Sequence, residues 1–430
     1  MMRNSWALAL VLAGAAGLTA EACDLWGPLA AGDFKGVKSC VDSSNVNVLS
    51  GSDSPLTAAA KFAFRDPADI VALLLDEGAK INFQGDERRT ALMNAAGKAW
   101  TQSVDLLIKK GADVRPRDAN GRTALMYAGD AYDPTIVDQL VAAGAKVNDA
   151  DVDGRTPLMA AVVRVRKMGT AAENDRMKTI ERLLAAQADI NARDKEGKTA
   201  LMLAAESGQT EAVRKLLAAK AAVNLQSKDG RTALHHALFA DKPVESKILM
   251  DAGADINLPD AEGRTPLMSV LDWRRDALVD DLLNRGADVN RKSNDGKTAL
   301  MEAVEARRED YIQKLMQRKA LINLQNKEGD TALMIAARMN SGEKCVKTLL
   351  RYSPNLTLKN VAGKTALAIA QESRHEESVL FIRAQRDNGA SGTKSAIPAG
   401  GSGSAERPGT SKSFLSNKTG TAKGAPTTRR

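Results

Sequence analysis

The sequence contains few of the side chains on which most enzymes and metal sites depend. Three histidines and three cysteines occur in 430 residues, and aromatic residues make up 3% of the chain. The one close pair of such residues is the adjacent His235 and His236. On a helix, adjacent side chains point about 100° apart and do not chelate one ion well. The sequence therefore predicts no metal site and no bound cofactor.

Catalytic motifs are missing as well. The sequence has no Gly-x-Ser-x-Gly elbow, no His-Glu-x-x-His helix and no complete phosphate-binding loop. Three tripeptides resemble the end of such a loop but lack its upstream glycine: Gly197-Lys198-Thr199, Gly296-Lys297-Thr298 and Gly363-Lys364-Thr365. We predict that the protein is not an enzyme.

The positive charge of the chain is not spread evenly. Residues 384–430 carry eight basic and two acidic residues, so they supply +6 of the formal net charge of +8. The rest of the chain is close to neutral and offers no continuous basic stripe for a phosphate backbone. We therefore do not expect a nucleic-acid partner.

Long apolar runs are absent after the N-terminus. There, Arg3 precedes an apolar run from Trp6 to Leu18, and Ala20-Glu21-Ala22 follows as a small-x-small cleavage site. This pattern is typical of a signal peptide, predicted at residues 1–22 with cleavage before Cys23. The run is too short to span a bilayer, and no later segment approaches ~20 apolar residues. We expect an exported protein, either periplasmic or secreted.

The cysteines leave two alternatives open for the new N-terminus. Cys23 could be acylated and anchor the protein to a membrane, although Ala20 and Glu21 depart from the lipoprotein pattern. Alternatively, Cys23 and Cys40 form a disulfide that joins the ends of the first two helices, as an exported chain permits. Cys345 falls in the apolar stripe of a late helix, which favours a buried thiol.

What the sequence does contain is an internal repeat. A Thr/Ser-Ala/Pro-Leu tripeptide recurs ten times, mostly at intervals of 33 residues. A glycine turn precedes it, Thr or Ser is placed to cap a helix, and a second helix ends in an apolar pair and often a glycine. Ala-Asp-Ile/Val-Asn commonly leads into the next unit. The tripeptides begin at Ser54, Thr90, Thr123, Thr156, Thr199, Thr232, Thr265, Thr298, Thr331 and Thr365.

This pattern resembles the ankyrin repeat family. The resemblance implies an all-α repeat fold, a solenoid of about ten to eleven helix-turn-helix units with β-hairpin loops. Residues 23–50 read as a degenerate capping repeat and residues 51–383 as the ankyrin repeats. Residues 384–430, rich in Gly, Ser, Thr, Pro and basic residues, are predicted to be a disordered tail.

Methionine replaces the family's usual histidine in most units, and the histidine remains only at His235. A row of methionine sulfurs could bind Cu(I). We favour the interpretation that these methionines pack between stacked helices, because methionine adapts its shape to gaps. These residues are Met93, Met126, Met159, Met202, Met268, Met301 and Met334.

The resemblance also implies a concave groove, lined by the first helices and the loop tips, in which a protein partner binds. The residues seven and eight positions after each Thr then face the groove. Among them Phe239 and Trp273 predict an aromatic patch, with His236 one turn before Phe239. The alternative is that Trp273 merely packs on its neighbours Arg274 and Arg275. Basic residues of the loop tips would form the rim: Arg115, Arg117, Arg193, Lys195, Arg291 and Lys292.

These observations predict a monomeric, non-catalytic protein-protein interaction scaffold in an extracytoplasmic compartment. Two alternatives stay open: a secreted effector or toxin-neutralising protein that blocks an enzyme, and a lipoprotein scaffold tethered through Cys23. An insertion at Arg164–Asp175 is expected to be a surface loop or, alternatively, a second contact site.

Overall fold

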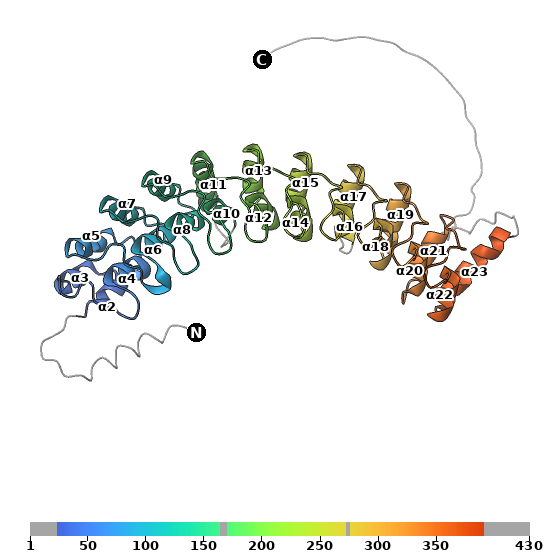
Figure 1. Cartoon of the computed structure of the whole chain (residues 1–430), viewed down its shortest axis with the longest axis horizontal. Helices are drawn as coiled ribbons and strands as arrows, with labels where there is room; N and C mark the ends of the chain where they lie inside the picture. The colour runs from blue at the N-terminus through green and yellow to red at the C-terminus, as the bar shows by residue number, and fades with distance from the viewer. Residues whose placement is uncertain (1–23, 164–169, 272–275, 391–430) are drawn as a thin grey trace, which may run out of the picture. The chain divides into compact units, whose positions relative to one another are not determined.

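Paired helices make up the part of the chain that the structure, a computed structural model, describes: residues 24–163, 170–271 and 276–390. These ranges contain 22 α-helices and no strand. The helices form eleven successive pairs (Figure 1), so the predicted all-α repeat fold of ten to eleven units is confirmed. The pairs are α2 (Trp26–Ala31) with α3 (Phe34–Cys40), α4 (Pro55–Phe62) with α5 (Ala68–Asp76), α6 (Ala91–Gly97) with α7 (Thr101–Lys109), α8 (Ala124–Ala131) with α9 (Pro134–Ala142), α10 (Pro157–Val162) with α11 (Thr170–Ala185), α12 (Ala200–Glu206) with α13 (Thr210–Ala218), α14 (Ala233–Phe239) with α15 (Pro243–Asp251), α16 (Pro266–Leu271) with α17 (Asp276–Asn284), α18 (Ala299–Glu305) with α19 (Glu309–Gln317), α20 (Ala332–Arg338) with α21 (Glu343–Leu350), and α22 (Ala366–Glu372) with α23 (Glu376–Ala390).

The helices lie in two layers. The first helix of each pair packs beside the first helices of neighbouring pairs, and the second helices do the same (Figure 1). The core runs between the layers and consists mainly of Leu, Ala, Val and Met. All seven methionines of the repeated register are 0–1% exposed. Their role as packing residues is therefore confirmed.

From α4 onwards each first helix begins at a Thr or Ser, buried in every repeat except at Thr365, which is half-buried, and each repeat is named here by this cap residue. In the Thr90 repeat the Thr90 hydroxyl accepts the Met93 backbone N–H at 3.2 Å. The predicted caps make this bond in most repeats, while Thr123 and Thr298 occupy the same buried position without it. Since a side-chain cap satisfies an otherwise unpaired N–H, it fixes where the helix starts.

His235 occupies the methionine register of the Thr232 repeat. Its Nδ1 accepts the Thr232 backbone N–H at 3.3 Å and lies 3.0 Å from the Thr232 hydroxyl, which completes a capping box. His235 therefore makes a cap hydrogen bond that methionine cannot make at this position. Burial lowers the pKa of His235 to about 4.

The turns between repeats are stacked by backbone hydrogen bonds. The Ala261 N–H of one turn donates to the Asp229 carbonyl of the turn before it at 2.9 Å, and the same bond recurs along the array. Within a turn, Asp151 N–H donates to the Arg155 carbonyl at 3.0 Å. The expected β-hairpins are therefore tight turns that do not extend into strands in the described ranges, because so few residues pair on each side.

A second link between repeats comes from the asparagine that ends each Ala-Asp-Ile/Val-Asn segment. The Asn224 Oδ1 accepts the Asp255 backbone N–H at 2.8 Å, 31 residues further along the chain. Equivalent bonds of 2.7–2.9 Å are made by Asn47, Asn82, Asn148, Asn191, Asn257, Asn290 and Asn323.

Two helices extend into segments for which the sequence predicted no helix. Helix α11 begins at Thr170, so the second half of the insertion Arg164–Asp175 is helical and not a loop. Arg176, only 2% exposed, holds this extension by donating to the Val162 carbonyl at 3.2 Å. Helix α23 continues to Ala390, past Arg383, where the tail was expected to begin.

Several predictions fall outside the described ranges. These are the signal peptide at residues 1–22, residues 391–430 of the tail, and Cys23, so the Cys23–Cys40 disulfide stays a prediction. Cys345 is 2% exposed, and its expected burial is confirmed. Among the described helices, none has the length and apolarity needed to cross a membrane.

We predict that two glycine substitutions differ in their effect on folding. Gly230 and Gly253 both have positive φ, so alanine costs about 1–2 kcal/mol of backbone strain at either position. A Cβ on Gly253 meets nothing within 4 Å, whereas on Gly230 it would lie 2.2 Å from the Ala261 nitrogen. Gly230→Ala should therefore lower the urea midpoint by clearly more than Gly253→Ala; equal losses would contradict the turn stacking.

Replacing His235 should change how stability depends on pH. The pKa of His235 falls from an ordinary 6.5 to about 4 on folding, so the unfolded chain binds the proton more tightly. The neutral imidazole contributes fully to the free energy of unfolding above pH 6.5. As the pH falls from 6.5 towards 4, this free energy decreases by about 3 kcal/mol, because the unfolded chain takes up the proton first. His235→Met, which restores the residue of seven other repeats, should remove this part of the loss. Parallel wild-type and variant curves of unfolding free energy against pH would argue against it.

Candidate functional site

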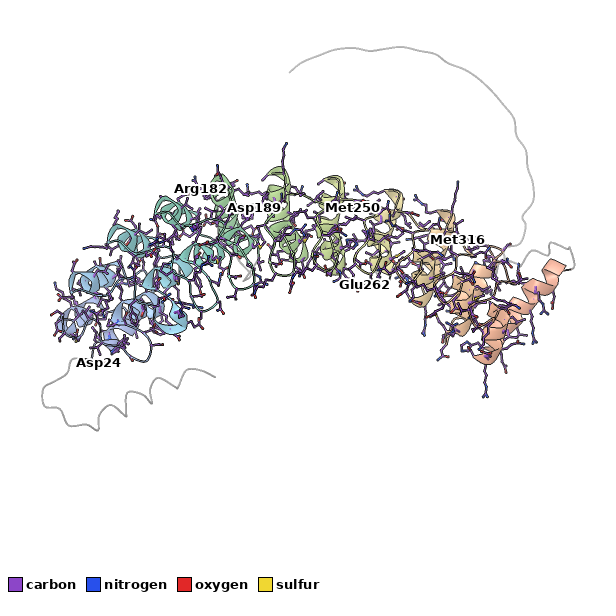
Figure 2. All side chains as sticks on the ribbon, in the orientation of Figure 1. Asp24, Arg182, Asp189, Met250, Glu262 and Met316 are labelled. Atoms are coloured by element: carbon purple, nitrogen blue, oxygen red, sulfur yellow. The ribbon has the colours of Figure 1, made fainter. Side chains whose placement is uncertain are left out.

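The turns and the first helices form one continuous side of the array, which we call the turn face. Glu262, labelled in Figure 2, lies in one of these turns, while Met250 belongs to the layer of second helices. This is the side on which sequence analysis expects a partner to bind. Its chemistry can be compared repeat by repeat, because the spacing is nearly constant.

Ion pairs occupy much of the turn face. In six repeats the residue directly before the cap pairs with the residue seven positions after the cap, at the end of the first helix. Lys198 and Glu206 are an example at 3.0 Å. Burial alone would lower the pKa of Lys198, but the hydrogen bond and charge of Glu206 raise it above its ordinary value. The pairs are Asp53–Lys61, Arg122–Asp130, Lys198–Glu206, Lys297–Glu305, Asp330–Arg338 and Lys364–Glu372.

The charge order within these pairs is not constant. Asp330 precedes its cap and pairs with Arg338 at 2.6 Å, the reverse of the Lys297–Glu305 pair at 2.7 Å. These six repeats therefore share a pair of opposite charges, but either of the two positions can hold the acid. Many of the side chains expected to contact a binding protein instead form ion pairs within their own repeat.

The structure changes the interpretation of His236 and Phe239. His236 is 5% exposed, its Nε2 lies 3.3 Å from the Ser227 hydroxyl, and its Nδ1 lies 3.7 Å from Glu206. Burial lowers the pKa of His236, and the Glu206 carboxylate opposes this in part. Phe239 is half-buried beneath the Arg231 guanidinium, 4.1 Å from the ring centroid. Trp273 lies outside the described residues, so the aromatic patch stays a prediction.

Half of the predicted basic rim is structural. Arg117, Arg193 and Lys292 each donate to a backbone carbonyl of the following turn, at 2.6–2.9 Å. Arg115 pairs with Asp113 of its own turn at 2.9 Å.

The other two rim residues, Lys195 and Arg291, are exposed. Neither side chain makes an ion pair or hydrogen bond within the described ranges. Of the predicted rim, these two cations are available to a partner.

Three described repeats lack this ion pair. In the Thr90 and Thr232 repeats, Gly97 and Phe239 stand in the place of the partner, and Arg89 and Arg231 pair with Glu87 and Asp229 of their own turns instead.

The Thr156 repeat is the third break in the pairing. Arg155 precedes the cap of the Thr156 repeat, but the position that should hold its acid is Val163. The Arg155 side chain is exposed and makes no ion pair with any described residue. Four residues after the cap, Ala160 stands where neighbouring repeats carry Tyr127 and Leu203.

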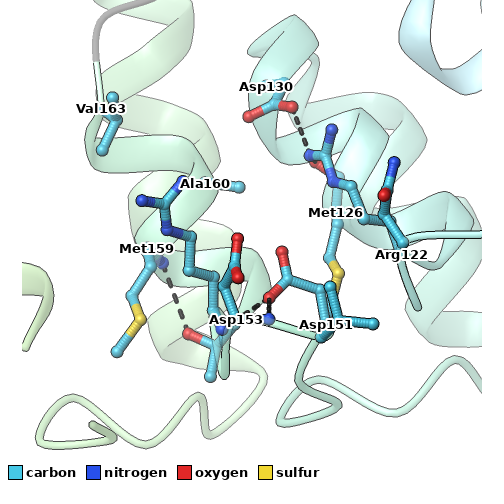
Figure 3. A pocket seen from close by; sticks show the side chains of 12 residues that line it. Arg122, Met126, Asp130, Asp151, Asp153, Met159, Ala160 and Val163 are labelled. Carbon is cyan, nitrogen blue, oxygen red and sulfur yellow. Dashed lines mark hydrogen bonds and ion pairs between the residues drawn. The ribbon is translucent and has the colours of Figure 1, made fainter. Parts of the chain in front are cut away.

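A pocket of about 320 Å³ opens at this break, between α8 and α10 (Figure 3). Met126 and Met159 lie in its lining, together with Arg122 and Arg155. The acidic lining residues are Asp130, Asp151 and Asp153.

Two of these acids are already engaged in different ways. Asp130 forms an ion pair with Arg122, and burial raises the pKa of Asp130 against the effect of that arginine. Asp151 uses Oδ1 to accept the backbone N–H groups of Asp153 and Arg155 at 2.9 and 2.8 Å. Its Oδ2 has no hydrogen-bond partner in the described part of the chain.

Sequence reasoning did not find this pocket. It searched the residues seven and eight positions after each cap for aromatic anchors, and so passed over a small residue at Ala160 and an apolar one at Val163. Comparing the residue before each cap with the residue seven after it marks Arg89, Arg155 and Arg231 as cations without an acid at that position. The ion pairs of Arg89 and Arg231 with other acids, which separate them from Arg155, are seen only in the structure. Within the described residues, no group of three or more His, Cys, Asp or Glu is arranged to hold a metal ion.

Comparison with known proteins agrees with the repeat architecture. A family model described as ankyrin repeats (3 copies) matches residues 56–151, 104–167, 168–260, 245–326 and 312–393. No curated protein matches the chain. Among solved structures, the crystal structure of the ankyrin repeat domain of Bcl-3, described as a unique member of the IkappaB protein family, is 27% identical. The match covers 54% of this chain and 99% of that one, with a TM-score of 0.47.

Proposed function

Because the chain belongs to the ankyrin-repeat family, we propose that it is a non-catalytic scaffold that holds a protein partner on its turn face. Ankyrin repeats are typically interaction modules, in which a fixed framework presents variable surface positions. The observation that carries the proposal is the break in the Thr156 repeat. There a framework ion pair is replaced by an unpaired arginine beside a pocket.

The proposal extends over more than one repeat. Arg155 and Lys195 are exposed cations in successive repeats, and Arg291 is a third further along the same face. A partner that contacts all three would run across several first helices, as an elongated repeat surface allows. Acidic groups on that partner would complement these cations, chiefly by raising the rate of association.

The place of action is the second part of the proposal. We infer export from residues 1–22, which have the polar start, apolar run and small-x-small site of a signal peptide. The simplest proposal is a periplasmic or secreted scaffold. The alternatives are a scaffold anchored to the membrane by a lipid on Cys23, and an exported protein that neutralises an enzyme.

Site-specific photocrosslinking in the native host tests the binding face. A photoreactive amino acid at Arg155 or Lys195 should capture the same protein, because both positions lie on the turn face. The matched controls are Lys109 and Arg182, exposed on second helices with side-chain exposures of 71% and 57%. Capture that is equal at all four positions, or absent at both turn-face positions, would refute the assignment.

The intact mass of the mature protein tests the export model. Cleavage before Cys23 should give a chain of residues 23–430 in the extracytoplasmic fraction, with the mass of the bare polypeptide. An added diacylglyceryl mass would support the lipoprotein alternative. An uncleaved chain starting at Met1 in the cytoplasm would exclude export.

A further inference from the structure

The pocket beside Arg155 has an internal template, because the preceding repeat contains the same arrangement with the space filled. In the Thr123 repeat, Tyr127 stands four residues after the cap. Its ring lies between the guanidinium groups of Arg89 and Arg122, at 5.1 and 4.4 Å from the ring centroid. Its hydroxyl donates to Asp118 Oδ2 at 2.6 Å.

Two arginines and one aspartate also line the pocket, one repeat further along. Arg89, Arg122 and Asp118 of the template correspond to Arg122, Arg155 and Asp151 of the pocket. The position of Tyr127 itself corresponds to Ala160. The pocket therefore has the two arginines and the aspartate of the Tyr127 site, with alanine in place of the tyrosine.

The carboxylates show the correspondence in detail. Asp118 uses Oδ1 for the backbone N–H groups of Asn120 and Arg122, both at 2.8 Å, and keeps Oδ2 for the tyrosine hydroxyl. Asp151 makes the same two backbone bonds with Oδ1. Its Oδ2 accepts no hydrogen bond from any described residue, as is also true of Asp260 Oδ2 at the equivalent position.

One lining residue differs from the template. Asp130 stands where the Thr90 repeat has Gly97, and a Cβ at Gly97 would lie 3.3 Å from the Tyr127 ring. The Asp130 carboxylate is turned towards Arg122, with which it forms an ion pair (Figure 3). About 320 Å³ remains open in its presence.

We propose that the pocket lined by Arg122, Arg155, Asp151 and Ala160 binds a tyrosine side chain of the partner protein. The ring stacks between the two guanidinium groups over Met126 and Met159, and the hydroxyl donates to Asp151 Oδ2. Arginine over an aromatic face is a favourable cation–π contact. A hydrogen bond to a carboxylate is stronger than one to a neutral acceptor.

The charges of the pocket select against two related side chains. Phenylalanine would leave Asp151 Oδ2 without a donor, as an apolar ring cannot replace the hydroxyl. Phosphotyrosine would bring its negative charge towards Asp151, Asp130 and Asp153, against two arginines of which one is already paired. A neutral hydroxyl fits this balance of charges best.

This inference rests on the proposed function but is tested without the partner. The full chain is labelled with ¹³C in the methionine methyl groups, and the Met126 and Met159 signals are assigned by Met→Leu substitutions. N-acetyl-tyrosinamide should shift both signals saturably. N-acetyl-phenylalaninamide should bind at least about tenfold more weakly, because it lacks the hydroxyl donor.

Two variants provide matched controls. Ala160→Tyr fills the pocket in the manner of Tyr127 and should abolish the shifts while keeping the melting temperature at or above that of the wild type. Asp151→Asn keeps the turn, since Asn326 occupies the same position and accepts the same two backbone bonds. It replaces the free carboxylate oxygen by an amide NH2, to which the tyrosine hydroxyl cannot donate, so the preference for tyrosine over phenylalanine should fall.

Several outcomes would overturn the proposal: no saturable shift up to the solubility limit of the tyrosine amide, equal binding of the phenylalanine amide, or tighter binding of the phosphotyrosine amide. Tighter binding of free tyrosine than of its capped amide would point to a small-molecule ligand and would likewise overturn it. Crosslinking through Lys195 without tyrosine binding would refute the pocket and leave the scaffold function standing; the reverse result would refute the scaffold.

Discussion

The register between repeats is the constraint on which the rest of the structure depends. An asparagine at the end of one repeat accepts a backbone N–H about 31 residues ahead, and each turn donates a backbone N–H to the turn behind it. In both bonds the donor is a backbone N–H of the later repeat. Because every repeat is placed on its neighbour in the same way, side chains of equal phase occupy equivalent surroundings. That equivalence makes Tyr127 a valid template for the space beside Ala160.

The same register explains why the fold could be predicted and the site could not. Helix caps such as Thr90, turn glycines such as Gly230 and the buried methionine register recur in phase, so their roles follow from repetition. The roles of Arg193 and Lys292 do not, because a basic residue in a turn looks the same whether it faces a partner or the next backbone carbonyl. Only the geometry shows that these two side chains bridge neighbouring turns.

A pocket made by a missing side chain is harder still to find. Ala160 is an ordinary helix residue by composition, and Val163 continues an apolar run. Their significance depends on Arg155, which lies on the other side of the cap, and on Arg122 of the preceding repeat. The positions of these four residues, which come from two repeats, must all be known before the pocket can be recognised. The insertion presents the same difficulty, since the burial of Arg176 depends on how α11 returns to the end of α10.

The small free energy of an exposed ion pair explains why the residue before each cap and the residue seven after it can be replaced. An exposed ion pair contributes about 0.2–1 kcal/mol, so losing the one at Arg155 and Val163 costs the array little. Losing a turn glycine or a buried core residue costs several times more. A substitution therefore costs least stability at these ion-paired positions, and it leaves the spacing of the repeats unchanged. The rigid frame fixes the backbone position of the unpaired arginine, so a ligand has to order only its side chain, at a cost of about 0.5–1.5 kcal/mol.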